Sequence, residues 1–135
     1  MAQIHVIRVM EKKIINTKAA PAPIGPYNQG IVVNGTLYIS GQICIDPQNG
    51  TLKNRDIQDE THQVMQNLKV ILSEAGMSFS NVVKTTIFIT DMNQFSDINE
   101  VYGKYFSGDF PARETVQVSA LPKFVNVEIS MIAVG

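Results

Sequence analysis

The sequence predicts an α+β domain in which two helices pack on one face of a β-sheet. Segments rich in β-branched and aromatic residues alternate along the chain with two segments whose apolar residues recur every three or four positions. The length of 135 residues suits a single domain, residues 1–135, with one hydrophobic core. Because two helices cannot cover both faces of such a sheet, we expect the other face to meet a partner, as in symmetric oligomers.

The first predicted element is a β-hairpin over residues 30–44. Two β-prone runs flank Asn34-Gly35, a residue pair that favours tight hairpin turns. The preceding stretch, residues 19–26 (AAPAPIGP), is rich in proline and is expected to form an ordered loop. A second turn is expected at residues 46–50 (DPQNG).

A long helix follows the hairpin. We expect Asp56 to cap its N-terminus and Gly76 to end it. His62 falls on or beside the polar side, and a solvated surface role is expected for it because no second histidine or cysteine is near. The apolar residues of the helix recur at three- and four-residue spacing and form one stripe. They are Ile57, Val64, Met65, Leu68, Ile71, Leu72 and Ala75.

Three strands and a second helix complete the predicted fold. Residues 82–90 (VVKTTIFIT) are β-branched and aromatic and indicate a strand. An amphipathic helix is predicted over residues 94–106, with its aromatic stripe in the core. Two strands are predicted at residues 114–120 and 125–134, joined as an antiparallel pair through Leu121-Pro122-Lys123.

Composition argues against several classes of function. The formal net charge of -1 gives no field that would hold nucleic acid or a membrane surface. Cys44 is the single cysteine, so an internal disulfide is excluded and a buried apolar role is expected. The N-terminal stretch lacks the ~7–15 apolar residues of a secretory signal and the ~20 of a membrane span, so a cytoplasmic location is expected. With no phosphate loop and no histidine pair, neither a metal nor an organic cofactor is expected.

Arg113 and Glu128 are the candidates for chemistry. Alternation along the predicted antiparallel pair places both on its polar face. With Gln117 opposite Glu128, Arg113 lies about 13 Å away at ~3.3 Å per residue, which leaves room for a small ligand. A guanidinium holds a carboxylate through two parallel hydrogen bonds, and a carboxylate can exchange a proton with water. Hydrolysis of a small carboxylate-bearing molecule would use both groups, but a weak surface ion pair explains the same spacing.

Five short motifs, in this order, make the chain resemble the Rid (reactive intermediate deaminase) family. They are Gly25-Pro26-Tyr27-Asn28-Gln29, Ser40-Gly41-Gln42, Pro111-Ala112-Arg113, Leu121-Pro122 and Val127-Glu128-Ile129. The similarity runs from about residue 12 to residue 134. It implies a chorismate-mutase-like α+β domain with a mixed β-sheet that assembles as a homotrimer with clefts between subunits.

The resemblance also implies an activity, the hydrolysis of 2-imino and 2-enamino acids such as 2-iminobutanoate and 2-aminoacrylate to 2-oxo acids and ammonia. Arg113 would bind the substrate carboxylate, Glu128 would position or activate the attacking water, and Tyr27 would line the cleft and assist orientation or proton transfer. Backbone N–H groups of Gly41 and Thr115 would help to hold the substrate. The implied substrate-binding residues are Ser40, Gly41, Asn99 and Thr115.

The chain departs from the family pattern at three places. Thr115 stands where cysteine is common, Glu114 follows Arg113 where a small or apolar residue is typical, and residues 1–9 lie outside the resemblance. Strand alternation is expected to point Glu114 away from the cleft. Three alternatives stay open: a non-catalytic regulatory protein that binds small carboxylates, an RNA-acting protein, and a chorismate-mutase-type enzyme. The net charge weighs against the second alternative, and the single cationic anchor weighs against the third.

Overall fold

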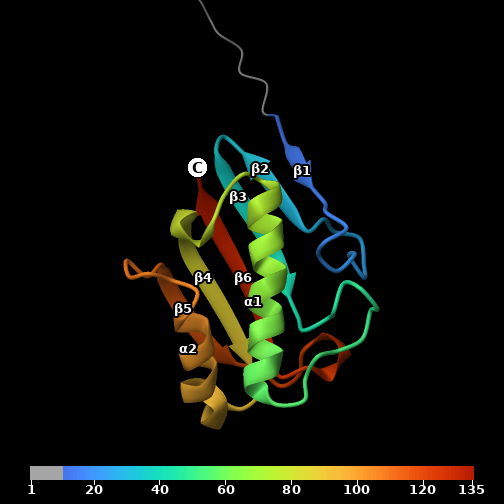
Figure 1. Cartoon of the computed structure of the whole chain (residues 1–135), viewed down its shortest axis with the longest axis vertical. Helices are drawn as coiled ribbons and strands as arrows, with labels where there is room; N and C mark the ends of the chain where they lie inside the picture. Colours follow the sequence, from blue (N-terminus) through green and yellow to red (C-terminus); the bar gives the residue numbers. More distant parts are fainter. Residues whose placement is uncertain (1–10) are drawn as a thin grey trace, which may run out of the picture.

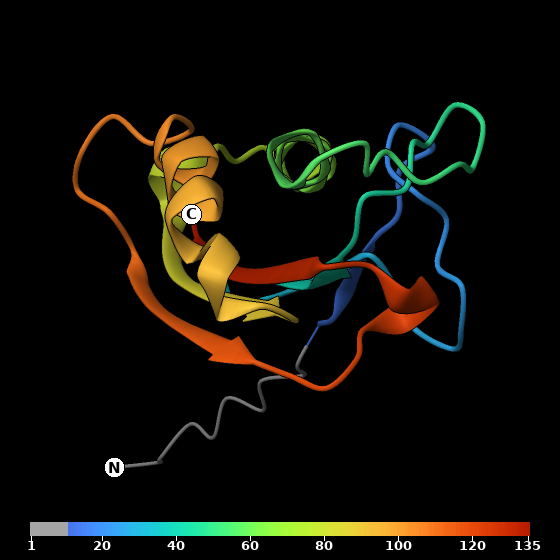
Figure 2. The ribbon, with the colours of Figure 1, turned by 90° about the horizontal axis from the view of Figure 1, so that it is seen from below.

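Both helices lie on the same face of a six-stranded β-sheet (Figures 1 and 2). The computed structural model describes residues 11–135, so the leader at residues 1–9 lies outside the described residues. The strands are β1 (Lys13–Ile15), β2 (Gly30–Val33), β3 (Thr36–Gln42), β4 (Val82–Ile89), β5 (Ala112–Gln117) and β6 (Val127–Val134). The helices are α1 (Ile57–Glu74) and α2 (Phe95–Gly103), with short 3-10 helices η1 (Phe79–Asn81), η2 (Met92–Gln94) and η3 (Pro122–Phe124). The predicted α+β class, with a mixed sheet and two helices on one face, is confirmed.

The predicted pairing of the last two strands is wrong. The strand order is β1-β2-β3-β6-β4-β5. Strand β6 lies between β3 and β4 and is antiparallel to both, whereas β5 lies at the edge and pairs in parallel with β4. The helix α2 supplies the crossover that a parallel pair needs. The segment through η3 therefore connects two strands that are not neighbours.

Burial explains why β6 is central and β5 lies at the edge. Every second residue of β6 from Val127 to Ala133 is buried, whereas no residue of β5 is. Alternation in the sequence indicates that a strand has two unlike faces, but it does not identify the neighbouring strand. The depth of burial makes that distinction here.

The predicted hairpin and the ends of the first helix are confirmed. Asn34 and Gly35 both have positive φ, 49° and 77°, as a two-residue hairpin turn requires. At the start of α1, the Asp56 carboxylate accepts a hydrogen bond of 2.7 Å from the backbone N–H of Asp59. At its end, Gly76 adopts a φ of 73°, which ends the helix.

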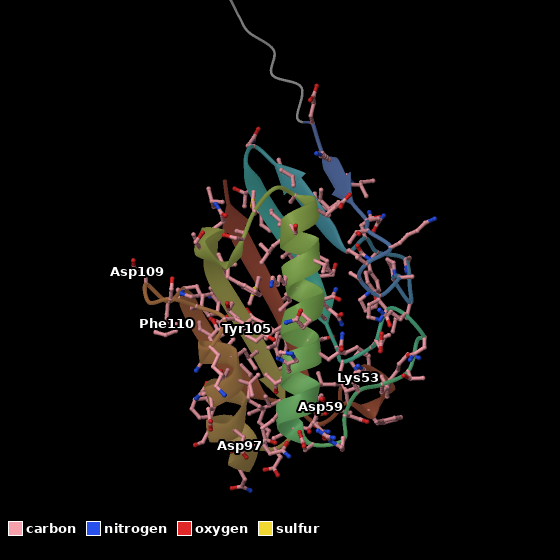
Figure 3. The ribbon with its side chains drawn as sticks, in the orientation of Figure 1. Lys53, Asp59, Asp97, Tyr105, Asp109 and Phe110 are labelled. Atoms are coloured by element: carbon pink, nitrogen blue, oxygen red, sulfur yellow. The ribbon has the colours of Figure 1, made fainter. Side chains whose placement is uncertain are left out.

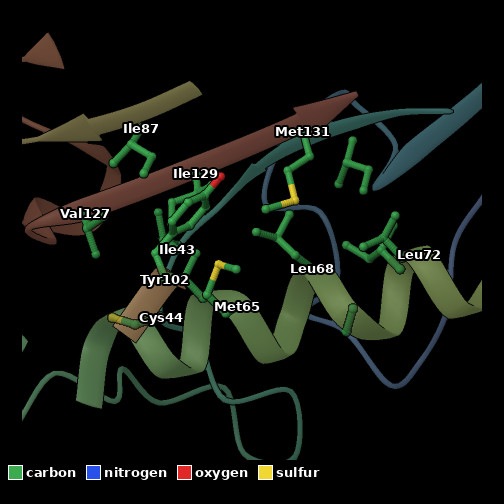
Figure 4. Packing of buried hydrophobic residues seen from close by; sticks show 14 of the residues in the cluster. Ile43, Cys44, Met65, Leu68, Leu72, Ile87, Tyr102, Val127, Ile129 and Met131 are labelled. Atoms are coloured by element: carbon green, nitrogen blue, oxygen red, sulfur yellow. The ribbon is translucent and has the colours of Figure 1, made fainter. Parts of the chain in front are cut away.

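The hydrophobic core lies between α1 and the sheet. Figure 4 shows Met65 and Leu68 of α1 turned toward Ile129 and Met131 of β6, and all four side chains are buried. Cys44 is also buried, as predicted, and desolvation raises the pKa of its thiol to about 12. Among residues 11–135, no helix combines the length and apolar character needed to cross a membrane.

The second helix is shorter than predicted, but the aromatic residues after it still pack. Helix α2 ends at Gly103, and Tyr105 follows it. The Tyr105 hydroxyl accepts a hydrogen bond of 3.0 Å from Gln66 Nε2 and is hydrogen-bonded to His62 Nδ1, which ties the end of α2 to α1. His62 is exposed, as predicted, and Tyr105 is its specific partner.

A buried carboxylate fixes the start of β6 to α1. Glu60 is fully buried, and its two carboxylate oxygens accept three hydrogen bonds. The donors are the backbone N–H groups of Asn126 (2.7 Å) and Val127 (2.9 Å) and the Asn126 side-chain amide (2.8 Å). Because buried donors without partners are costly, this contact is expected to contribute strongly to the stability of the fold.

We expect Glu60→Ala to lower the free energy of unfolding by about 3 kcal/mol, because it leaves buried donors unsatisfied. Urea unfolding followed by circular dichroism measures this effect. Glu74→Ala, an exposed glutamate at the end of the same helix, is the matched control and should change stability by less than about 0.5 kcal/mol. Equal effects of the two substitutions would contradict the anchoring role.

Candidate active site

The candidate catalytic residues lie on opposite faces of the sheet. Thr85 of β4 is the register partner of both Arg113 and Met131, and the buried side chains of Thr85 and Met131 face the helices. Arg113 therefore points to the helix-covered face. Phe88 is the register partner of Glu128 and lies three residues from Thr85, so its side chain points to the opposite face. Glu128 therefore points to the face that the helices do not cover, which we call the open face.

The prediction that Arg113 and Glu128 share one face is therefore wrong for a single chain. That prediction assumed that the apolar residues of the β5 segment face the core. In the structure Val116, which is 43% exposed, lies on the open face, and the polar residues Arg113 and Thr115 lie toward α2. Polarity identified two faces of this edge strand but assigned them to the wrong sides.

Arg113 is held against α2 on three sides. Its Nη1 donates a hydrogen bond of 2.7 Å to Asn99 Oδ1. Its Cζ lies 5.1 Å from the ring centroid of Tyr102 and 5.6 Å from that of Phe95, both within the range of cation–π attraction. The three α2 residues follow at four- and three-residue spacing, which places them on one face of the helix. The helical spacing predicted this aromatic stripe in the core and did not predict its contact with the arginine.

The guanidinium opens onto a cleft of about 440 Å³, which we call the arginine cleft. Its lining residues are Asn99, Tyr102, Gly103, Phe110, Pro111 and Arg113. Figure 3 shows Phe110 at the outer edge of the molecule, on the segment that leads into β5. Since Asn99 occupies only one donor position, the remaining N–H groups are available for a planar carboxylate.

Glu114 does not compete for this arginine. Its side chain points to the opposite face of β5 and forms an ion pair of 2.7 Å with Lys84. The prediction that Glu114 points away from Arg113 is confirmed. No carboxylate of residues 11–135 forms an ion pair with the Arg113 guanidinium.

Thr115 lies two residues beyond Arg113 on the same face of β5. Its Oγ1 is buried and has no hydrogen-bond partner among the described residues. The N–H of Val118 donates to Ile89 of β4 (2.8 Å), and alternate N–H groups of a strand point the same way. The N–H of Thr115 therefore points to the free edge of the sheet, where it can reach a ligand or another chain.

The second group of site residues forms the glutamate pocket, with a volume of about 240 Å³. The lining residues are Ile24, Tyr27, Ser40, Gly41, Pro122 and Glu128. Ser40 Oγ donates a hydrogen bond of 2.6 Å to the carbonyl of Asn28, and Tyr27 Oη accepts one of 3.1 Å from the N–H of Ile24. These contacts position the loop that carries Tyr27 beside the end of β3.

Gly41 gives Glu128 the space it needs. A Cβ atom at position 41 would lie 2.8 Å from Glu128 Cδ and 3.0 Å from Oε1, closer than such atoms approach. The carboxylate therefore packs directly over the backbone of β3, where a register shift interrupts the pairing with β6. Burial at this position raises the pKa of Glu128 above its ordinary value.

The seven predicted residues thus assemble into two separate clusters. Arg113, Asn99 and Thr115 lie at the β5–α2 edge on the helix-covered side. The remaining four line the glutamate pocket, and they are Tyr27, Ser40, Gly41 and Glu128. Within one chain the sheet lies between the carboxylate-binding and the acid/base candidates.

Comparison with known proteins identifies the family. The family model described as endoribonuclease L-PSP matches residues 17–135. The chain belongs to the Rid family. A Rid family protein of Yersinia pestis of known structure superimposes with a TM-score of 0.90 at 52% identity, covering 93% of this chain and 100% of that one.

Other Rid relatives carry more specific names. The chain is 50% identical over 123 residues to the mouse 2-iminobutanoate/2-iminopropanoate deaminase, covering 91% of each protein. It is also 50% identical over 122 residues to a RutC family protein of Pyrococcus horikoshii, covering 90% of this chain and 97% of that one. Escherichia coli TdcF, solved with bound serine, superimposes with a TM-score of 0.88 at 44% identity, covering 91% of this chain and 98% of TdcF.

We expect Glu128→Gln to stabilise the protein at neutral pH. Because the pKa of Glu128 is raised in the folded state, the folded protein binds its proton more tightly than the unfolded chain does. Ionisation of Glu128 therefore lowers the free energy of unfolding as pH rises from the ordinary pKa of glutamate through the raised pKa. The amide removes that cost, so the advantage of Glu128→Gln should be largest at neutral pH and vanish in acid.

Urea unfolding of both proteins at several pH values measures this difference. Glu114→Gln is the control, since that glutamate lies on the exposed part of the sheet in an ion pair. A Glu128→Gln protein that is less stable than wild type at pH 7 would contradict the assigned cost of burial.

Proposed function

We propose that this Rid protein hydrolyses small 2-imino and 2-enamino acids to 2-oxo acids and ammonia. The observation that supports this most directly is the Arg113 guanidinium, fixed by α2 and free to bind a carboxylate at the mouth of a cleft. The mouse relative named 2-iminobutanoate/2-iminopropanoate deaminase supports the same substrate class. Serine bound to TdcF supports a small amino-acid skeleton as the ligand.

We propose further that the complete site forms between subunits of a homotrimer. Arg113 and Glu128 cannot act on one small molecule from opposite faces of their own sheet, whereas Glu128 of a second chain can approach the Arg113 edge. The open face also carries an apolar row across four neighbouring strands, which suits an interface between copies. In register order the row is Ile14, Ile31, Tyr38 and Ile132.

In the proposed reaction, Arg113 binds the substrate carboxylate through parallel hydrogen bonds. The N–H of Thr115, at the free edge of β5, gives the carboxylate or the imine a further donor. This grip orients the C=N bond toward the glutamate pocket of the neighbouring chain. Positioning of this kind is a large part of catalysis for a reaction that already proceeds in water.

Glu128 then acts as the acid/base group. Its carboxylate takes a proton from water as the water oxygen bonds to the imine carbon, which gives a tetrahedral amino alcohol. Transfer of that proton to nitrogen allows the C–N bond to break as the hydroxyl oxygen forms the carbonyl, and Glu128 passes the hydroxyl proton to the departing ammonia. One water is consumed, and one ammonium ion leaves from the protonated imine. The raised pKa of Glu128 makes its carboxylate a stronger base for the first step.

We propose a cytoplasmic location for this activity, because the single cysteine suits a reducing compartment. The alternative function is a regulatory protein that binds small carboxylates without chemistry. Ligand binding without acceleration of imine hydrolysis would favour that alternative.

We expect Arg113→Ala to reduce kcat/KM for 2-iminobutanoate by roughly a hundredfold or more, because it removes two charge-assisted hydrogen bonds. The imine is generated in situ from threonine with a dehydratase. Formation of 2-oxobutanoate is followed in the presence of a scavenger that competes for the imine. Arg113→Lys, which keeps the charge without the planar fork, should retain intermediate activity.

Arg55→Ala is the matched control, because the Arg55 side chain is 83% exposed and lies outside both clusters. It should leave the rate unchanged. A folded wild-type protein that does not accelerate hydrolysis of any small 2-imino acid would overturn the proposed activity.

A further inference from the structure

Tyr102 is a buried residue that lines the arginine cleft and that the proposed reaction does not use. Its side chain is only 4% exposed, and its ring forms part of the cleft lining. The ring centroid lies 5.1 Å from Cζ of Arg113, closer than the Phe95 ring on the preceding turns of α2. The guanidinium thus packs against an aromatic ring that is almost fully buried.

The Tyr102 ring is itself tied to the strand beside Arg113. Its hydroxyl donates a hydrogen bond of 3.0 Å to Oγ1 of Thr85, which is fully buried. Thr85 is the register partner of Arg113 across the parallel β4–β5 pair. Contacts therefore connect α2 to β4 through this hydrogen bond, β4 to β5 through strand pairing, and β5 to α2 through the guanidinium.

Together with Asn99, the ring limits how the guanidinium can move. Asn99 accepts a hydrogen bond from one Nη, and the guanidinium carbon lies over the Tyr102 ring. An arginine side chain that is free in solution loses substantial conformational entropy when it binds a carboxylate. A guanidinium that is already restrained loses less, so its carboxylate contact is stronger.

We propose that Tyr102 is a positioning residue whose aromatic ring orients Arg113 for the substrate carboxylate. This inference rests on the proposed function for its substrate and adds a specific role for α2 in binding it. The aromatic ring performs the positioning, and the hydroxyl supplies a hydrogen bond to the buried Thr85 Oγ1.

A proton-transfer role for Tyr102 is a distinct alternative with different consequences. The hydroxyl is directed at Thr85, and burial raises the pKa of the phenol, so it stays protonated at neutral pH. Under that alternative, loss of the hydroxyl alone would abolish turnover. Under the positioning role, loss of the hydroxyl is tolerated and loss of the ring is not.

The test compares three variants with the wild-type protein. Tyr102→Leu removes the ring and should raise KM for the imine, and Kd for the unreactive product 2-oxobutanoate, by about 5- to 30-fold, with a smaller change in kcat. Phe95→Leu removes the more distant ring and should act in the same direction with a smaller factor. The double variant Tyr102→Phe/Thr85→Val keeps the ring and removes both hydroxyls together, so it leaves no buried hydroxyl without a partner and should stay within about twofold of wild type.

Tyr105→Leu is the matched control. This tyrosine follows the same helix and packs on Phe79, but its hydrogen bonds are with α1 and it does not line the arginine cleft. Its Kd for 2-oxobutanoate should match that of wild type. In an Arg113→Ala background, Tyr102→Leu should cause no further loss of binding, because its effect acts through the arginine.

A readout independent of catalysis is the Arg113 Nε–H signal in a ¹H–¹⁵N NMR spectrum. Ring currents should displace this signal in wild type and in Tyr102→Phe/Thr85→Val, and Tyr102→Leu should return it toward the position of a free arginine. An unchanged signal and an unchanged Kd in folded Tyr102→Leu would overturn the proposal, as would an inactive Tyr102→Phe/Thr85→Val that binds 2-oxobutanoate normally. If wild type proved inactive on imines, the proposed function would fail, but this signal and Kd would still decide the role of Tyr102.

Discussion

The central position of β6 determines both the packing of the core and the faces on which the candidate site residues lie. This strand hydrogen-bonds to β3 on one side and to β4 on the other, and its buried residues form the floor of the core beneath α1. The Glu60 carboxylate fixes its first residues by binding two backbone N–H groups. Because side chains alternate along a strand, this position turns Glu128 to the face away from the helices. The edge strand β5, two strands away, turns Arg113 to the other face.

Different contacts position Arg113 and Glu128 in the two halves of the site. On the β5 side, Asn99 and the rings of α2 hold the guanidinium. On the β3–β6 side, the absence of a side chain at Gly41 lets the Glu128 carboxylate lie against the backbone, at a cost in desolvation that appears as its raised pKa. A partly buried carboxylate that destabilises the folded state at neutral pH is the pattern expected when a position serves chemistry.

Local features of the fold were predictable from the sequence, and non-local ones were not. The Asn34-Gly35 turn and the Asp56 cap depend on backbone geometry within a few residues, and both were predicted correctly. The neighbours of β5 and β6 depend on which strand buries more surface over the whole chain, and a hairpin was predicted instead. The open face adds to this difficulty, because exposed Val116 gives β5 an apolar side that does not face the core.

The candidate site shows the same division. The resemblance to the Rid family supplied the residue types, and the structure brings Arg113 and Asn99 within hydrogen-bond distance. Spacing along the chain suggested that Arg113 and Glu128 share a face, but spacing does not reveal the intervening strand β4. Tyr102 was assigned to the core because a buried aromatic on a helix is usually packing, and only the fold shows the guanidinium beside it.

Subunit mixing tests whether a complete site combines Arg113 of one chain with Glu128 of another. Arg113→Ala and Glu128→Gln proteins, each expected to be nearly inactive alone, are unfolded together in equal amounts and refolded, with native mass spectrometry to verify mixed oligomers. Random assembly places both intact residues in about a quarter of the clefts, so imine hydrolysis should recover to roughly that fraction of the wild-type rate. A mixture of Arg113→Ala with the Arg113→Ala/Glu128→Gln double variant serves as the control and should stay inactive. Verified mixed oligomers that recover no activity would contradict the account.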